Sequence, residues 1–302
     1  MHTDFYLLDT SFQYQNGCTI ETIEEAVKNL VEDYDYIKEQ SDTVFRHEDI
    51  YAVNICPDFY IADLYQADKE CPLSRDVKKY LQKIIDHSKA TAWSNSEIIQ
   101  LINEQEIENI LETQETHGLL ALFETNPEVK KEYIVYNQRN WLNFHRYFLA
   151  KYALNESHFI DECAKYFPNL YFHERNKDTI KPIFNDCIKK IVAHLSELND
   201  KFNLAKTEPY SRQETMKIFN SIANLDWNAS IEGNIKKKNV MTFEFLLNDN
   251  SNATKDMYCE LHLKLTLDDK GSYDQNRRIY FHEGDKTIQK GKILVGHIGK
   301  HL

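Results

Sequence analysis

The chain has 302 residues, of which 42% are apolar, so it can bury a sizeable core. Its formal net charge of −12 disfavours a protein that coats nucleic acid along its whole surface. No run approaches the ~18 apolar residues of a membrane span, and the first residues lack the features of a signal peptide. We therefore expect a cytoplasmic protein with no membrane partner.

Helical periodicity is clearest from Thr22 onward, where apolar residues recur on one helix face and Thr22 and Glu25 are spaced as a capping box. The same reasoning predicts further helices at 74–87, 96–113, 127–153, 156–167, 179–202 and 211–224. Short strands are predicted at 5–8, 50–55 and 119–123.

The composition changes near the end of this helical region. Only Gly17 and Gly118 precede residue 230, whereas six glycines follow it, and the excess of acidic residues is confined to positions 1–225. Dense glycine between β-branched runs is typical of strands and turns. The sequence predicts an acidic, mainly helical domain at 1–205 and a β-rich, candidate catalytic domain at 206–302.

Four strand-like runs follow one another in the second domain, at 240–247, 257–267, 277–283 and 292–298. Their short connections favour antiparallel pairing. The expected fold class is therefore α+β, with a helical N-terminal domain and a C-terminal four-stranded antiparallel sheet.

Apolar and polar residues alternate strictly along the run at 257–267, so one face is expected to pack on a core and the other to display polar groups. If the neighbouring strands share this facing, the polar face collects titratable side chains. They are Glu260, His262, Lys264, Arg278, Tyr280, His282 and His297. A metal-free ribonuclease needs such an inventory: a base, an acid and cations for the phosphorane charge.

The closing stretches 277–282 (RRIYFH) and 292–302 (KILVGHIGKHL) resemble the end of RelE/YoeB-type messenger-RNA-cleaving toxins. The resemblance covers some 65 of the 302 residues. It implies a small antiparallel sheet whose basic face cleaves RNA. The matching residue types are Lys264, Arg278, His282, His297 and His301. The chain departs from the pattern because its C-terminal part is not strongly basic and follows a long helical extension.

The leading hypothesis is a metal-independent endoribonuclease of toxin or antiviral-defence type, with RNA as substrate and no cofactor. We expect His262 and His282 to transfer protons, Lys264 and Arg278 to stabilise phosphate charge, and His297 to support them. Further substrate contacts are expected from Tyr280, Lys300 and His301. The helical part would control access or recognise a regulatory protein partner.

Three alternatives remain open. Glu260 and Lys264, with Glu244 or Asp249, are loosely similar to the motif of metal-dependent DNA nucleases. Arg139 and His145 fit the short Arg-x(4–6)-His pattern of HEPN ribonucleases. The polar sheet face is also compatible with a non-enzymatic module that binds a protein or peptide.

Overall fold

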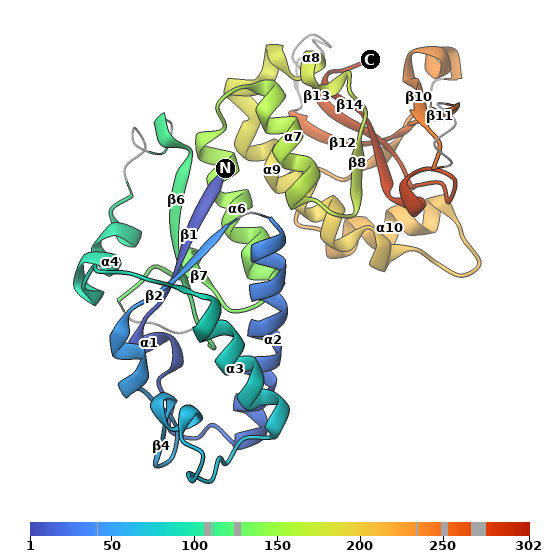
Figure 1. Cartoon of the computed structure of the whole chain (residues 1–302). Helices are drawn as coiled ribbons and strands as arrows, with labels where there is room; N and C mark the ends of the chain where they lie inside the picture. Colours follow the sequence, from blue (N-terminus) through green and yellow to red (C-terminus); the bar gives the residue numbers. More distant parts are fainter. Residues whose placement is uncertain are drawn as a thin grey trace. The chain divides into compact units, whose positions relative to one another are not determined.

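The computed structural model describes residues 1–40, 42–105, 110, 112–123, 128–233, 235–248, 253–266 and 276–302. The chain divides into two compact units, Met1–Phe148 and Leu149–Leu302 (Figure 1). The sequence-based division at 205/206 lies later in the chain. The difference arises because strand β8 (Leu170–Phe172) pairs with the final strand, β14 (Ile293–Lys300), which joins residues 149–205 to the C-terminal sheet.

The two units differ sharply in charge. Unit 1 contains 27 Asp and Glu against 13 Lys and Arg, a net charge of −14, whereas unit 2 contains 21 against 23, a net charge of +2. A polyanion would be repelled by the first unit and not by the second. No helix in the described parts of the chain is long and apolar enough to cross a bilayer.

Unit 1 contains a five-stranded sheet in the order β5-β2-β1-β6-β7, in which every neighbouring pair is parallel. Its strands are β1 (His2–Leu7), β2 (Thr43–Arg46), β5 (Lys89–Ala90), β6 (Glu115–Leu120) and β7 (Ile134–Val135). Its helices are α1 (Asp9–Phe12), α2 (Ile20–Glu39), α3 (Arg75–His87), α4 (Asn95–Asn103) and α6 (Gln138–Tyr152), the last of which extends past the boundary. The region that was expected to be mainly helical therefore contains a parallel sheet, because helices and parallel strands alternate along it; the strands predicted at 5–8 and 119–123 overlap β1 and β6.

Short elements connect this framework. They are the 3-10 turns η1 (Glu48–Ala52), η2 (Ile61–Tyr65) and η3 (Lys131–Tyr133), and the small hairpin of β3 (Asn54–Cys56) and β4 (Phe59–Tyr60). The strand predicted at 50–55 is thus mostly a 3-10 turn. The helix predicted from 127 begins only at Gln138, after η3 and β7.

Helix α2 confirms the helix predicted from its periodicity. The cap is Thr19 and not the predicted Thr22: Thr19 accepts a hydrogen bond from the amide of Thr22, which already lies in the first turn, and the apolar face is buried. One polar residue also lies on the buried side: Asp33 is 2% exposed, and its Oδ2 has no hydrogen-bond partner. Burial raises the pKa of this carboxyl to about 8, and the neighbouring Glu32 adds to the effect.

Helix α6 packs its aromatic side chains on the parallel sheet. The rings of Phe5 and Phe144 have centroids 5.2 Å apart. A Cβ at Gly118 would lie only 2.8 Å from Phe5 and 2.9 Å from Phe144. Strand β6 therefore requires glycine at this position, because the two rings occupy the space of a side chain.

Unit 2 contains a five-stranded sheet in the order β8-β14-β13-β12-β9. The remaining strands are β9 (Ser230–Ile231), β12 (Leu261–Thr266) and β13 (Arg277–His282). The pair β8–β14 is parallel and the other pairs are antiparallel, so the sheet is mixed. Two further strands, β10 (Thr242–Leu246) and β11 (Thr254–Tyr258), form a separate hairpin. The prediction of a four-stranded antiparallel sheet is corrected accordingly.

Helical elements accompany the unit 2 sheet. They are α7 (Glu156–Tyr166), α8 (Asn176–Thr179), η4 (Lys181–Ile183), α9 (Phe184–Lys201), η5 (Asn203–Ala205), α10 (Arg212–Ile222), η6 (Ile235–Met241) and η8 (Gln289–Gly291). Strand β12 contacts α9, and the ring of Phe281, which pairs with Leu261, lies 5.2 Å from that of Phe202. The leucine face of the sheet is therefore its helix-covered core.

The run predicted as one strand at 257–267 is two strands. Strand β11 ends at Tyr258 and pairs with β10, whereas β12 begins at Leu261 and pairs with β13. Met257 and Cys259 pack with the hairpin, in an apolar cluster that contains Tyr280 of the sheet. The strict alternation therefore crosses a break at Cys259 and Glu260.

Strand β14 contains a bulge that a buried asparagine stabilises. Tyr280 pairs with His297, but the next residue, Phe281, pairs with Val295, so one residue of β14 is left over. The fully buried side chain of Asn176 replaces the missing ladder bonds. Its Nδ2 donates to the carbonyl oxygen of Val295 at 2.9 Å, and its Oδ1 accepts from the amide of Ile298 at 2.7 Å.

The bulge also positions the β10–β11 hairpin. A Cβ at Gly296 would lie 2.3 Å from the ring of Phe243 and 2.8 Å from Sγ of Cys259. The guanidinium of Arg175 lies 4.6 Å from the centroid of the same ring, on which it stacks. Phe243 is therefore held against the bare backbone of β14.

Candidate functional site

The strand register brings most of the sequence-predicted residues onto one sheet face. His262 pairs with Tyr280, Lys264 pairs with Arg278, and Tyr280 pairs with His297. Directly paired residues point to the same side of a sheet. We call this set, together with two nearby residues described below, the Arg278 cluster: Lys237, His262, Lys264, Arg278, Tyr280, His297 and His301.

The polar face was expected to be open, and it is largely covered instead. Arg278 is 5% exposed, His262 6% and His297 4%, and Tyr280 is fully buried among residues of the hairpin. Lys264 and His301 are half-buried and Lys300 is exposed. The half-buried members of the Arg278 cluster are therefore Lys237, Lys264 and His301.

Within the described residues, the hydrogen bonds of the Arg278 side chain go to backbone carbonyl oxygens. Its Nη1 donates to the carbonyl oxygens of Thr266, at 2.8 Å, and Arg277, at 3.0 Å, and its Nε has no hydrogen-bond partner. No carboxylate of the described residues forms an ion pair with it. Burial lowers the pKa of this guanidinium, which stays charged because arginine is protonated at any physiological pH. The result is a buried cation with unused donor capacity.

The two buried histidines are neutral near pH 7. Burial, and then the charge of Arg278, lower the pKa of His262 to about 4. Burial also lowers the pKa of His297 to about 4. Nε2 of His297 donates to the carbonyl oxygen of Lys300 at 2.9 Å, and Nδ1 of each ring has no partner. Neither ring is thus well placed to take up a proton from a macromolecular substrate.

His301 is the more accessible histidine. Its Nδ1 lies 2.5 Å from the hydroxyl of Tyr280, and Nζ of Lys237 donates to its Nε2 at 3.3 Å. Lys237 also donates to the carbonyl oxygen of Leu302. Burial, Lys237 and Arg278 all lower the pKa of His301. Lys237 was not among the predicted site residues, although the run Lys236-Lys237-Lys238 was a visible signal in the sequence.

Two predicted residues lie outside the cluster. Nδ1 of His282 accepts a hydrogen bond from the amide of Gly284 at 3.1 Å, and its Nε2 lies 3.7 Å from Glu283. Glu260 forms an ion pair with Arg212 of α10, which also binds Glu283. The carboxylate of Glu260 is therefore engaged by α10.

The metal-dependent alternative gains no support from the remaining carboxylates. Glu244 is exposed on β10, and Asp249 lies outside the described residues. Across the described ranges of the chain, no group of three or more His, Cys, Asp and Glu side chains is placed to hold a metal ion.

Arg139 and His145, the residues of the HEPN-like pattern, are not brought together. Arg139 is exposed, whereas His145 is fully buried in unit 1. Its Nε2 lies 3.2 Å from Oδ2 of Asp42, which also accepts from Nε1 of Trp141 at 3.2 Å. His145 is therefore part of a buried structural network.

The parallel sheet of unit 1 has a second place where a ligand could bind. Strand β1 lies between β2, which follows it in the chain on one side, and β6, which comes later and lies on its other side. The strand order therefore changes direction at β1. Open α/β sheets bind ligands outside the carboxyl ends of the strands at such a switch point. Asp9 lies there, with Oδ1 accepting from the amide of Thr10 at 2.6 Å. The amide of Leu122 donates to the carbonyl oxygen of Ser11 at 3.0 Å and links the two loops.

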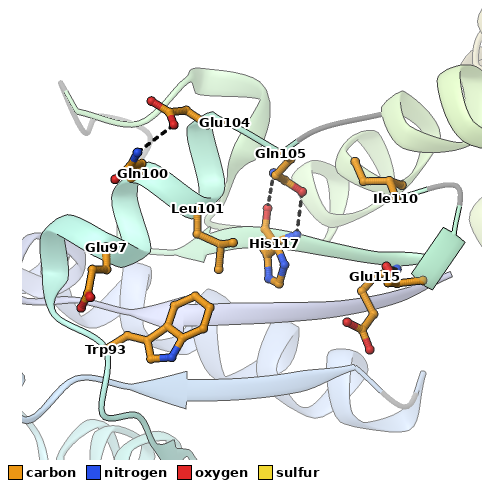
Figure 2. A pocket seen from close by; sticks show the side chains of 10 residues that line it. Trp93, Glu97, Gln100, Leu101, Glu104, Gln105, Ile110, Glu115 and His117 are labelled. Atoms are coloured by element: carbon orange, nitrogen blue, oxygen red, sulfur yellow. Dashed lines mark hydrogen bonds between the residues drawn. The ribbon is translucent and has the colours of Figure 1, made fainter. Parts of the chain in front are cut away.

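A cavity of about 550 Å³ lies between α4 and β6 (Figure 2). Trp93, Leu101 and Ile110 form its apolar part, and Glu97, Glu104 and Glu115 its acidic part. Glu97 accepts from the amide of Ser94, and Glu104 accepts from Gln100 at 2.9 Å. These two carboxylates thus accept hydrogen bonds at the N-terminal and the C-terminal end of α4.

Comparison of the chain with protein-family models, with curated proteins and with solved structures finds no match. The function is therefore argued from the geometry of the site.

Proposed function

We propose that unit 2 binds RNA at the Arg278 cluster and cleaves it without a metal ion. The observation that carries the proposal is the guanidinium of Arg278, which is 5% exposed, lacks an ion-paired carboxylate among the described residues and keeps Nε unpartnered. A buried charge is costly unless it is paired, and a phosphate group would supply the ion-paired partner that the described residues do not give Arg278.

The charge distribution of the chain supports the same assignment. Lys237 and Lys264 lie at the partly exposed rim of the cluster, and Lys264 forms no ion pair within the described residues. Unit 2 has a net charge of +2, whereas unit 1 has −14. Long-range electrostatics therefore directs a polyanion toward the second unit.

The chemistry of the cluster suits cleavage by internal attack. The 2′-oxygen of RNA attacks the adjacent phosphorus, the bond from phosphorus to the 5′-oxygen breaks, and a 2′,3′-cyclic phosphate and a 5′-hydroxyl are formed. Arg278 and Lys264 stabilise the charge on the phosphorane oxygens. His301, the accessible histidine, donates a proton to the leaving 5′-oxygen. Water is not consumed, and DNA cannot react because it lacks the 2′-hydroxyl.

The test is incubation of the full chain with end-labelled single-stranded RNA, and with DNA of the same sequence, in EDTA. We expect cleavage of RNA alone, with a 2′,3′-cyclic phosphate on the upstream product. Lys264→Ala should weaken RNA binding and Arg278→Lys should slow cleavage by about 10²-fold, because lysine cannot reproduce the forked contact. Circular dichroism would confirm that each variant is folded.

Asp9→Asn, at the switch point of unit 1, is the matched control and should leave cleavage unchanged. Cleavage that needs Mg²⁺ and disappears in Asp9→Asn, while surviving in Arg278→Lys, would move the activity to unit 1 and refute the proposal. RNA binding without cleavage under any condition would instead favour a non-enzymatic binding module.

A further inference from the structure

A cavity of about 430 Å³ lies in unit 2, at the end of strand β13. One wall is the connection from β13 to β14, and the other is the connection from η5 to α10. Its charged and aromatic lining consists of Lys206, Tyr210, Glu283, Asp285, Lys286 and Lys290. None of these six residues belongs to the Arg278 cluster. The volume of the cavity lies in the range of pockets that hold small organic ligands.

The wall that follows β13 is fixed by its own backbone. Gly284 has a φ of +106°, and a Cβ there would lie 2.4 Å from the carbonyl oxygen of Gly291, so the two ends of the connection touch. The carbonyl oxygen of Asp285 accepts from the amide of Ile288 at 2.9 Å, and its carboxylate accepts from the amide of Thr287 at 2.9 Å. Ile288 is fully buried in the apolar cluster of the hairpin. This wall is therefore preorganised, which lowers the cost of binding a ligand.

Three lysines of the cavity keep their charge for a ligand. Lys286 and Lys290 are exposed, and Lys206 is half-buried. Nζ of Lys206 donates to the carbonyl oxygen of Glu283 at 2.9 Å, which uses one of the three N–H donors of an ammonium group. Within the described residues, none of the three lysines forms an ion pair.

Both carboxylates of the cavity are paired with other cations. Glu283 forms an ion pair with Arg212, and Asp285 forms one with Nζ of Lys255 at 2.6 Å. A carboxylate beside a cation has little net charge left to offset the lysines. The cavity is therefore positive, and a phosphate group is the anion that several ammonium groups bind best.

Tyr210 adds an aromatic surface to the same cavity. Burial, and then the charge of Glu283, raise the pKa of its hydroxyl, while Arg212 lowers it. The hydroxyl end of the ring thus lies beside the ion pair of these two residues. The side chain is nevertheless 44% exposed. A nucleobase can stack on such a ring, and stacking accepts any of the bases because each has a π-face.

We infer that this cavity binds a nucleotide, with its phosphate on the three lysines and its base against Tyr210. The inference goes beyond the proposed function, because no group that reacts at the Arg278 cluster takes part in it. A free mononucleotide and a nucleotide within a single-stranded RNA offer the same chemistry.

The primary test is calorimetric titration of the full chain with AMP, and separately with adenosine and inorganic phosphate. We expect AMP to bind at least about tenfold more tightly than either part, because only AMP engages the lysines and the ring together. Lys286→Ala/Lys290→Ala should weaken AMP binding by about tenfold or more. Tyr210→Ala should weaken it by about tenfold and change the affinity for phosphate by less than about twofold.

Two matched controls accompany these variants. Lys217→Ala removes an exposed lysine of α10, and Tyr60→Ala removes a tyrosine of unit 1 that is 46% exposed. Neither should change the affinity for AMP by more than about twofold. Circular dichroism would confirm that every variant is folded.

A short single-stranded RNA in which every 2′-hydroxyl is methylated identifies the source of the nucleotide. It cannot be cleaved by internal attack, so its binding is measured apart from cleavage. If Tyr210→Ala weakens its binding by about tenfold, the cavity takes a nucleotide of an RNA strand. If Tyr210→Ala weakens AMP binding alone, the ligand is a free nucleotide. Either result supports the inference.

Other outcomes refute the inference. AMP that binds no more tightly than phosphate, or that binds Tyr210→Ala unchanged, would reduce the cavity to an anion site. Failure of both AMP and RNA to bind, or an equal loss in Lys217→Ala and in the double lysine variant, would exclude the cavity as a nucleotide site. If AMP binds as expected but the unaltered chain cleaves no RNA, the proposed function fails and this inference stands.

Discussion

Asp33 allows a quantitative prediction about the stability of unit 1. The carboxyl is 2% exposed, its Oδ2 has no hydrogen-bond partner, and its pKa is raised from 3.8 to about 8. The native state therefore holds a proton between these two pH values that the unfolded state releases. Stability falls as the pH rises through this window. A pH of 7 lies about 3 units above the pKa of this carboxyl in the unfolded chain. Keeping the proton in the native state therefore lowers the free energy of unfolding at pH 7 by ~4 kcal/mol.

Asp33→Asn removes this proton linkage while it preserves the shape of the side chain. We expect the variant to stabilise unit 1 by ~3–4 kcal/mol at pH 7 and by almost nothing at pH 4. Urea denaturation of the full chain, with hydrogen exchange of the α2 amides to identify unit 1, measures both values. Glu25→Gln, at an exposed position of the same helix, is the control. An equal difference at both pH values, or a destabilised variant at pH 7, would refute the reasoning.

Three further predictions concern unit 2 and the core of unit 1. Asn176→Ala removes the partners of the amide of Ile298 and of the carbonyl oxygen of Val295. It should lower the free energy of unfolding, measured by urea titration, by ~3 kcal/mol. A loss below ~1 kcal/mol would show that water replaces the side chain. RNA cleavage should rise as the pH falls from 8 toward 6, because His301 must be protonated and burial lowers its pKa; a rate that rises with pH would exclude it as the acid. Gly118→Ala should destabilise unit 1 by ~1–3 kcal/mol, seen as a lower melting temperature, since its methyl group would overlap two rings; an unchanged melting temperature would show that the rings move aside.

The helices with a clear apolar stripe were the predictable part of the fold. Helices α2, α3, α7 and α10 lie close to their expected ranges because each has one buried face, and α2, α7 and α10 also carry a capping side chain. The parallel sheet was missed because β5 and β7 have two residues each, too few to show a period. Residue patterns also gave no sign that Asp33 faces inward, since an aspartate on a helix is normally solvated.

The pairing of the site residues was predictable, but the covering of the site was not. Alternation along 261–266 and 277–282 placed His262, Lys264, Arg278 and Tyr280 on one face, as the register has it. The break at Cys259 and Glu260 contains no glycine or proline, so nothing in the sequence separated β11 from β12. The hairpin that results packs on Tyr280 of this face.

The contact of Phe243 with Gly296 links two features that are far apart in the sequence. The ring occupies the volume in which any larger residue at position 296 would place its Cβ, 2.3 Å away. A larger residue at position 296 therefore requires a smaller side chain at position 243. The two positions should vary together among descendants of this chain. Because the hairpin packs directly on the bare backbone at position 296, a single added carbon there would displace the ring of Phe243 and loosen the apolar cluster that the hairpin forms with Tyr280.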